Sequence, residues 1–516
     1  MKKILIIILY LSVATNLSVL AQVTIGSTKK PAQGAILMLD DGTSGASNEN
    51  ATKGLGLPRV ELQAYDKLQM GLIPNAELVG KESEHTGLLV YNIDIESKRC
   101  DPNYPTTGLH IWDGKKWQGL SVEPHFVPTT ERQGPPEVYT PNSYISTSGG
   151  KLIIPVEKAF AIWDWWGGGK HPEGKILPET SEAFLGNLSI AVLWEETEEI
   201  INTSKSVIRS VSFSESNDNI LTTSLDRNAN IYIKVQDGAV GNAVVSLKDG
   251  SGTVRWSWHI WVPKDDPTLT TYTHNTGRQI NTFMDRNLGA SRNGVIKADR
   301  EYTIGLGYQW GRKDPFPDYA KLSGAKTKVP VDVSKTLANV QSNNGDGEAT
   351  GLKYSINYPL GFIRNTAGTR DWYSTLSTQW DSRWGYAINE CNEIYTYKSE
   401  TDPCPEGWKV PTYIGATDAD SPWAKDGVSS TTPSLYTSFT FDRGFYFTNS
   451  DYNIGWYPSA GFRNYDGIIY DAGIHGDYWS ASPNGYNTRY FNVNSGAVRP
   501  YSLERAYSFS IRCVKE

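Results

Sequence analysis

The chain has 516 residues, 20% of them charged, and its formal net charge at pH 7 is −7. The negative balance and the absence of a basic block argue against nucleic acid as a partner. A chain this long is expected to form about two to four domains. Its 17 Trp, 29 Tyr and 48 Gly favour an extracellular β-rich binding protein over a cytosolic enzyme.

The first 21 residues have the pattern of a secretory signal peptide. Lys2 and Lys3 form a basic start, an apolar run covers 4–11, and the small residues Val19 and Ala21 precede Gln22. The apolar run is too short to span a membrane. The sequence therefore predicts export through the Sec pathway to the cell surface or the extracellular medium, with the periplasm as the other destination.

Residues 22–121 are predicted to form a β-rich N-terminal module. Short strands such as "GLLVYNID" and "GLHIW" are separated by glycine turns, and "WDGKKW" predicts a hairpin that turns at Asp113 and Gly114. The pattern resembles an N-terminal module of exported Bacteroidetes surface proteins and of some fibre-like proteins. This module is the candidate for contacts that build a homo-oligomer.

Residues 122–143 are Pro-rich and polar and are interpreted as a linker, and residues 144–266 are predicted to form an immunoglobulin-like β-sandwich. "KLIIPVEKAFAIW" is interpreted as a strand. "WDWWGGGK" (163–170) is interpreted as a hydrophobic hairpin tip, with an aromatic platform for sugar stacking as the alternative. The clearest strand is "VRWSWHIWV", in which alternate residues are predicted to face the core. They are Val254, Trp256, Trp258, Ile260 and Val262.

Residues 267–516 contain six motifs in order: "NTFMDRNLGA", "GYQWGRKDPFP", "DPCPEGWKVPT", "GWYPSAGFRN", "YWSASPN" and "FSIRCV". Together they resemble the Fibrobacter-type major paralogous domain. They resemble more closely the variable proteins of diversity-generating retroelements in gut Bacteroidetes. The resemblance implies a C-terminal α+β domain of the C-type-lectin-like fold that binds ligands, in a protein that is otherwise mainly β.

The resemblance also implies that some positions form the scaffold and others vary. "YWSAS", "FNVNSG" and "FSIRCV" match the scaffold. The varying positions would be Tyr486, Asn487, Tyr490, Arg499, Tyr501, Ser502, Leu503, Glu504, Tyr507 and Ser508, together with Tyr465, Asp466, Ile469 and Tyr470 in the preceding loop.

The residues themselves lead to a similar expectation. In "RYFNVN", Phe491 and Val493 alternate with Tyr490, so one strand face is apolar and the other carries contact groups. Pro500 should interrupt pairing, which makes "AVRPYSLERA" a loop. Tyr, Ser, Arg and Asn dominate antibody-type binding surfaces. The predicted ligand-binding residues are Tyr465, Tyr470, Tyr486, Asn487, Tyr490, Arg499, Tyr501, Ser502, Leu503, Glu504 and Tyr507, and Arg505 is expected to add a charged hydrogen bond.

The four cysteines match no zinc spacing. We predict a disulfide between Cys404 and Cys513, which leaves Cys100 and Cys391 either free or paired with each other. No catalytic set, metal site or cofactor is predicted, and His259 is interpreted as structural. The calcium-dependent sugar-binding tripeptides Glu-Pro-Asn, Gln-Pro-Asp and Trp-Asn-Asp are absent.

The sequence thus predicts an exported ligand-binding or adhesion protein that is not an enzyme. Its C-terminal domain would display a variable recognition surface to a protein or glycan on another cell, a phage or a host. The main alternative is a structural or tip component of a surface fibre or pilus. An enzyme is the third and weakest interpretation, because the lectin-like fold is shared with formylglycine-generating enzymes while Cys404 and Cys513 are expected to be structural.

Overall fold

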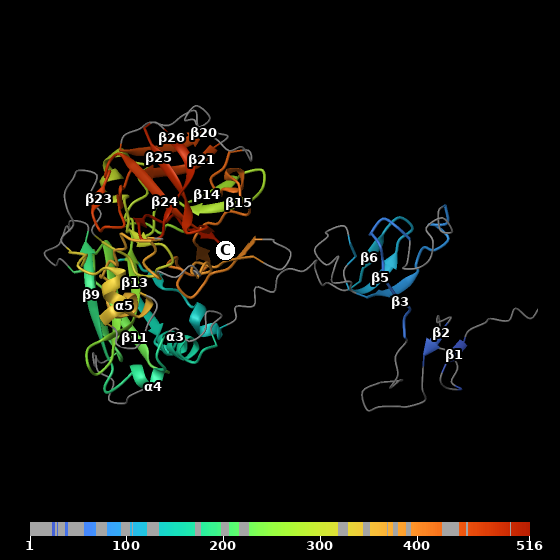
Figure 1. Ribbon diagram of the computed structural model, residues 1–516, viewed down its shortest axis with the longest axis horizontal. Helices are drawn as coiled ribbons and strands as arrows, with labels where there is room; N and C mark the ends of the chain where they lie inside the picture. The colour runs from blue at the N-terminus through green and yellow to red at the C-terminus, as the bar shows by residue number, and fades with distance from the viewer. Residues whose placement is uncertain are drawn as a thin grey trace, which may run out of the picture. The chain divides into compact units, whose positions relative to one another are not determined.

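The computed structural model describes residues 23–25, 28, 37–39, 56–68, 80–93, 104–105, 107–120, 134–170, 177–197, 206–215, 226–317, 329–343, 351–368, 370–374, 380–388, 394–425, 443–449, 452–495 and 497–516. The chain divides into an N-terminal unit, residues 1–127, and a C-terminal unit, residues 128–516 (Figure 1). The predicted signal peptide, most of the predicted linker, Cys100 and Cys391 lie outside the described residues.

The N-terminal unit contains a four-stranded sheet in the order β3-β4-β5-β6 and a parallel pair, β1 with β2. The strands are β1 (Val23–Ile25), β2 (Leu37–Leu39), β3 (Arg59–Val60), β4 (Leu89–Asn92), β5 (Gly108–Trp112) and β6 (Trp117–Gly119). The predicted hairpin is confirmed, because Trp112 pairs with Trp117 across it. Asp113 Oδ1 accepts bonds from the backbone amides of Lys115 and Lys116, each at 2.8 Å.

The C-terminal unit begins with two sheets around one core. One sheet has the order β7-β13-β12-β9, and the other has the order β10-β11-β8. Their strands are β7 (Ser143–Ile145), β8 (Lys151–Pro155), β9 (Ser189–Thr197), β10 (Ile208–Ser212), β11 (Asn230–Val235), β12 (Gly241–Lys248) and β13 (Val254–Val262). The side chains of Ile154 and Ile231 from one sheet and Trp258 from the other belong to the same buried cluster, which we call the sandwich core.

The prediction that a strand runs through "KLIIPVEKAFAIW" is wrong in its second half. Strand β8 ends at Pro155, and helix α3 (Glu157–Gly167) follows. The hairpin predicted for "WDWWGGGK" is therefore also wrong, because its tryptophans occupy the last turns of this helix. Phe160 and Trp163, three residues apart on one helical face, both pack against Phe184. Further short helices in this part are η2 (Pro136–Tyr139) and α4 (Thr180–Ala183).

Strand β13 is buried on both faces. The five residues predicted to face the core are all buried, as expected. Trp261 on the opposite face is also fully buried, but it belongs to a different cluster that includes Trp310, Trp479 and Cys513. We call this second cluster the central core. The sheet β7-β13-β12-β9 therefore separates two cores, and its second face is covered by the region that follows residue 267.

That region contains many short strands and few helices. They are β14 (Thr271–Asn275), β15 (Ile280–Met284), η3 (Lys297–Tyr302), β16 (Tyr308–Gln309), α5 (Leu337–Asn343), α6 (Leu352–Asn357), β17 (Tyr386–Ile388), β18 (Ile394–Thr396), β19 (Trp408–Lys409), η4 (Asp418–Asp420), β20 (Gly444–Asn449), β21 (Tyr452–Pro458), β22 (Phe462–Arg463), β23 (Ile469–Tyr470), β24 (His475–Asn484), β25 (Asn487–Asn494), β26 (Ala497–Glu504), β27 (Ser508–Phe509) and β28 (Val514–Lys515). The chain is thus mainly β and built from several separate sheets, as predicted.

The predicted disulfide between Cys404 and Cys513 is confirmed. It joins the segment before β19 to the segment before β28, and these two strands also pair in the sheet β14-β15-β28-β19. The last strand of the chain is therefore held both by the bond and by its neighbours β15 and β19.

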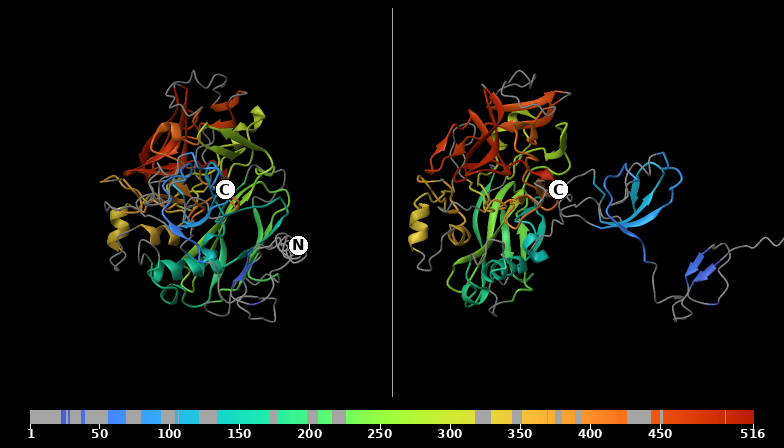
Figure 2. Two further views of the ribbon diagram at one scale, coloured as in Figure 1. Left: turned by 90° about the vertical axis from the view of Figure 1, so that its right-hand side faces the viewer. Right: turned by 45° about the vertical axis from the view of Figure 1, so that its right-hand side comes forward.

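The strands β24, β25 and β26 form a sheet that lies between two buried clusters. Trp479 and Tyr490 belong to the central core. Tyr478, Phe491 and Val493 point to the other face and belong to a third cluster. In both views of Figure 2 these strands, drawn in red, lie at the opposite end of the C-terminal unit from the green sandwich strands.

The predicted boundary between residues 266 and 267 falls inside one compact unit. The sandwich core itself includes Leu352, Trp372 and Trp380, which come from the region after that boundary. The domain boundaries drawn from the sequence therefore remain predictions. Within the described part of the chain, every helix falls short of the length and hydrophobicity that a membrane span requires.

Candidate recognition surface

Strand β26 forms one edge of its three-stranded sheet. The interpretation of "AVRPYSLERA" as a loop is wrong, because residues 497–504 pair along their length with β25. Pro500 lies opposite Phe491. A proline is tolerated in an edge strand because the outer side of the strand needs no hydrogen-bond donor for a neighbour. The predicted contact residues on this strand, Arg499, Tyr501, Ser502, Leu503 and Glu504, are thus held by pairing with β25.

The predicted binding residues differ widely in exposure. Tyr470 is 42% exposed, Tyr486 53% and Tyr501 48%, whereas Tyr490 is 4% exposed and Tyr507 9%. The remaining predicted residues are half-buried; they are Tyr465, Asn487, Arg499, Ser502, Leu503 and Glu504.

Tyr490 and Tyr507 lie in the central core. The Tyr490 ring packs 5.9 Å from Trp479 and 4.8 Å from Phe509, measured between ring centroids. Burial raises the pKa of the Tyr490 phenol well above its usual value, and burial together with the Glu504 carboxylate raises the pKa of Tyr507 to about 12. The face of β25 that was expected to carry contact groups is therefore covered by the central core, and neither tyrosine belongs to the exposed surface.

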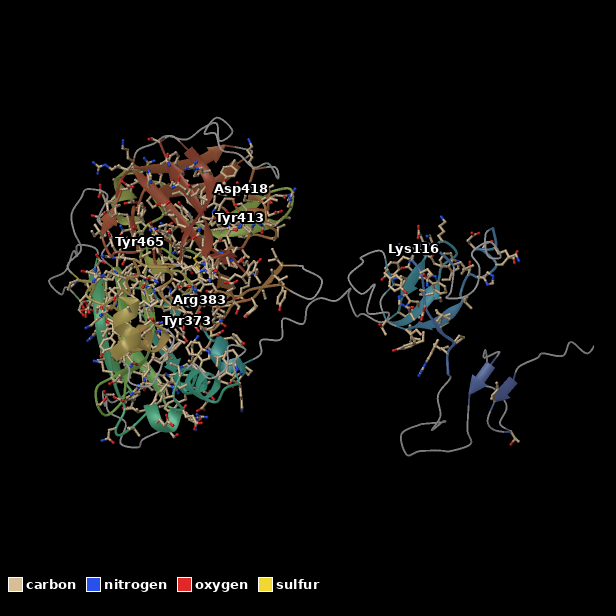
Figure 3. The ribbon with its side chains drawn as sticks, in the orientation of Figure 1. Lys116, Tyr373, Arg383, Tyr413, Asp418 and Tyr465 are labelled. Atoms are coloured by element: carbon tan, nitrogen blue, oxygen red, sulfur yellow. A yellow bond between two sulfur atoms is a disulfide. The ribbon has the colours of Figure 1, made fainter. Side chains whose placement is uncertain are left out.

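Tyr507 nevertheless joins the two predicted segments. Its ring lies 5.5 Å from that of Tyr465 and 5.9 Å from that of Phe462, and Phe462 stacks on Tyr470 at 6.0 Å. The loop 464–470 is therefore held beside the end of β26. Figure 3 places Tyr465 beside β23 in the C-terminal unit.

Arg370 is part of this site and was missed by the sequence analysis. Its Nη1 lies 2.8 Å from Glu504 Oε1, and its guanidinium carbon lies 4.2 Å from the centre of the Tyr465 ring. Arg370 has φ = 48°, which is uncommon for a residue other than glycine. The local sequence gives no signal for this pairing, because the two partners lie 134 positions apart.

Arg505 is not a surface group. The expectation that it offers a charged hydrogen bond to a ligand is wrong, because the side chain is fully buried. Its Nη2 donates to Asp381 Oδ1 at 2.6 Å and to the carbonyl of Gly485 at 2.8 Å. Arg505 therefore fixes the β24–β25 turn, which presents Tyr486. Burial lowers the pKa of its guanidinium.

We call a set of exposed and half-buried residues the recognition surface; they come from β23, β26, the start of β25, the turns beside these strands and Arg370. It comprises Arg370, Tyr465, Ile468, Tyr470, Ile474, Tyr486, Asn487, Arg499, Tyr501, Ser502, Leu503 and Glu504. Ile468 and Ile474 are 54% and 52% exposed and were also missed. Exposed aromatic and aliphatic groups next to arginines are typical of protein-binding surfaces.

His259 is structural in the way that the sequence suggested. Its Nδ1 lies 3.0 Å from Ser143 Oγ and its Nε2 lies 2.9 Å from Asn242 Oδ1. Burial lowers its pKa to about 3, so the ring is neutral at physiological pH. Among the described residues, no three His, Cys, Asp or Glu side chains gather as a metal site would need. A small pocket of about 10 Å³ lies beside Trp256 and Arg312, which is close to the smallest volume that can hold a water molecule.

Comparison with known families adds one finding. Residues 24–132 match the family model of the phage tail like trimerisation region. Neither the comparison with curated proteins nor that with solved structures returned a match. The matched segment includes the sheet β3-β4-β5-β6 and is a minor part of the chain. The N-terminal part of this protein is thus similar to a region that assembles phage-tail-like proteins into trimers.

Proposed function

We propose that the protein is a trimeric component of a surface fibre or phage-tail-like fibre. The observation that carries this proposal is the match of residues 24–132 to the phage tail like trimerisation region. A trimer would place three copies of the C-terminal unit on one support. Three linked binding sites gain effective concentration over a single site without any new contact.

We further propose that the C-terminal unit is the binding tip and acts by surface complementarity and not by catalysis. Tyr470, Tyr486 and Tyr501 would supply the aromatic contact area, and the pairing of β26 with β25 holds Tyr501 in place for this role. The partner would be a protein or glycan on another cell, a phage or a host. Export through the Sec pathway would bring the fibre to the cell surface.

The oligomeric state tests the first proposal. The mature chain, residues 22–516, should show the mass of three chains in light scattering coupled to size-exclusion chromatography. Residues 134–516 should show the mass of one chain. This shorter chain is expected to fold, because the described clusters of the C-terminal unit contain no residue before Val138. A full-length chain that elutes as a monomer would overturn the proposal.

The resemblance to variable proteins of retroelements supports a third part of the proposal, namely that the recognition surface is diversified. The test is to sequence the gene and its surroundings for a near-repeat of its 3′ end. Differences that fall only at template adenines and map to the codons of the recognition surface are the expected result. A genome without such a repeat would overturn diversification and leave the fibre proposal standing.

A further inference from the structure

Arg499 is the half-buried cation on the edge strand of the recognition surface. Its guanidinium carbon lies 4.7 Å from the centre of the exposed Tyr501 ring. Its Nε is buried and has no hydrogen-bond partner, and the part of the chain that the structure describes offers the guanidinium no ion pair. A buried charged donor without an acceptor is unfavourable. The buried Nε is shielded from solvent, so an acceptor supplied from outside would reach the terminal Nη groups, which also have no hydrogen bond within the described residues.

Neighbouring arginines differ from Arg499 in this respect. Arg370 pairs with Glu504 at 2.8 Å, Arg489 with Asp418 at 3.6 Å, and Arg505 with Asp381 at 2.6 Å. Arg499 therefore retains its two terminal Nη groups, which can bind a carboxylate through two parallel hydrogen bonds.

Asp477 is the acidic residue of this sheet that could form an ion pair with Arg499. The two residues lie in one cross-strand row, with Asn492 paired to each of them. Asn492 occupies the intervening position and donates to Asp477 Oδ1 at 2.6 Å. Asp477 Oδ2 is buried and accepts no hydrogen bond, so it receives none from Arg499 in this structure. Asp477 is thus not the partner of Arg499.

We propose that Arg499 binds a carboxylate of an acidic partner protein, with the Tyr501 ring supporting the guanidinium. The inference rests on the proposed binding function and names the chemistry of the partner. Charge complementarity selects an Asp or Glu side chain or a C-terminus. The exposed apolar groups of Ile468, Tyr470 and Ile474 on the same surface favour a protein over a glycan, because aliphatic side chains suit the dry centre of a protein interface.

The test uses the full-length protein and an array of peptides in which Asp or Glu is flanked by Leu or Phe. Each peptide has a matched copy with Asn or Gln in place of the acid. The wild type should retain acidic peptides at least about tenfold better than their amide copies, since hydrogen bonds between charged groups are the stronger class. Arg499→Gln should abolish the preference, and Arg499→Lys should keep only part of it, because lysine retains the charge but loses the fork.

The control variant is Arg209→Gln, which removes an exposed arginine of β10 that pairs with Asp237 and lies outside the recognition surface. It should keep the full preference. Equal retention of acidic and amide peptides by the wild type would overturn this inference but not the trimeric fibre, which the mass measurement tests. Retention of polygalacturonate alone, lost in Arg499→Gln, would overturn the assignment to a protein. A melting temperature of Arg499→Gln several degrees below that of the wild type would show an internal role and would also overturn it.

Discussion

Tyr490 and Tyr501 lie opposite each other on β25 and β26, with their ring centroids 5.9 Å apart, yet they belong to different environments. Tyr490 is 4% exposed and Tyr501 is 48% exposed. The difference arises because β25 is the central strand of its sheet, whereas β26 is at the edge. At the residue scale, position within the sheet decides which tyrosines can reach a partner.

This contrast predicts opposite results for two alanine variants. Tyr490→Ala should lower the free energy of unfolding by about 3–5 kcal/mol, because it empties a buried aromatic site. Tyr501→Ala should change it by less than about 1 kcal/mol and should weaken binding to the partner. Urea unfolding followed by tryptophan fluorescence measures both. Equal destabilisation by the two variants would show that Tyr501 is also a core residue.

Asp477 predicts a pH dependence of stability. Burial raises its pKa from 3.8 to about 7, and the hydrogen bond from Asn492 offsets part of that rise. The folded state therefore holds a proton that the unfolded state has already released, so stability should fall as pH rises from about 4 to about 7. A rise of this size corresponds to roughly 4 kcal/mol. Asp477→Asn, which is neutral throughout, should lack this decline.

The measurement is the free energy of unfolding of wild type and Asp477→Asn between pH 4.5 and pH 8, and the quantity of interest is their difference. His259 acts in the opposite sense, because its lowered pKa costs stability as pH falls below about 6.5. Its contribution is common to both proteins and cancels in the difference. Asp237→Asn, which changes an exposed carboxylate, serves as the control. A constant difference across the range would contradict the role of Asp477.

At the scale of elements, the sequence predicted well where one residue pattern has one structural solution. The Trp112–Trp117 hairpin, the buried residues of β13 and the Cys404–Cys513 disulfide are all present. The hairpin and the buried residues of β13 follow from local alternation, whereas the disulfide was one of the pairings that four cysteines allow. Fold class followed from the same signals, because short alternating strands with glycine turns recur along the chain.

The errors arose where tertiary packing determines the conformation of a segment or the exposure of a side chain. The alternation in "RYFNVN" shows that one strand face is apolar, but it cannot show that the central core covers the other face. Pro500 argues against an inner strand, yet it leaves a loop and an edge strand equally open. The tryptophans of α3 suit a strand or a helix, and contacts from distant segments, such as Trp380 on Trp166, complete their burial. Arg370 could not be found because its partners lie far away in sequence.

At the scale of the whole molecule, the two units have separate hydrophobic cores. The N-terminal core contains Leu62, Val90 and Trp112 and draws on no described residue beyond Trp117. Within the C-terminal unit, by contrast, Trp194, Val244 and Trp261 of the sandwich sheet are members of the central core that holds Trp479 and Phe509. The recognition surface is therefore built on a core to which the sandwich contributes.

This sharing predicts that residues 134–516 unfold as one cooperative unit. Trp261→Ala should destabilise both the sandwich and the region after residue 267. The indole is fully buried, and its Nε1 donates to the carbonyl of Ala290 at 3.0 Å. The loss should be about 3–5 kcal/mol. Hydrogen exchange of β11 amides and of β25 amides should accelerate by the same factor. Leu269→Ala, which changes a side chain that is 82% exposed, should leave both unchanged. Acceleration in only one of the two strands would instead support an independent domain boundary near residue 266.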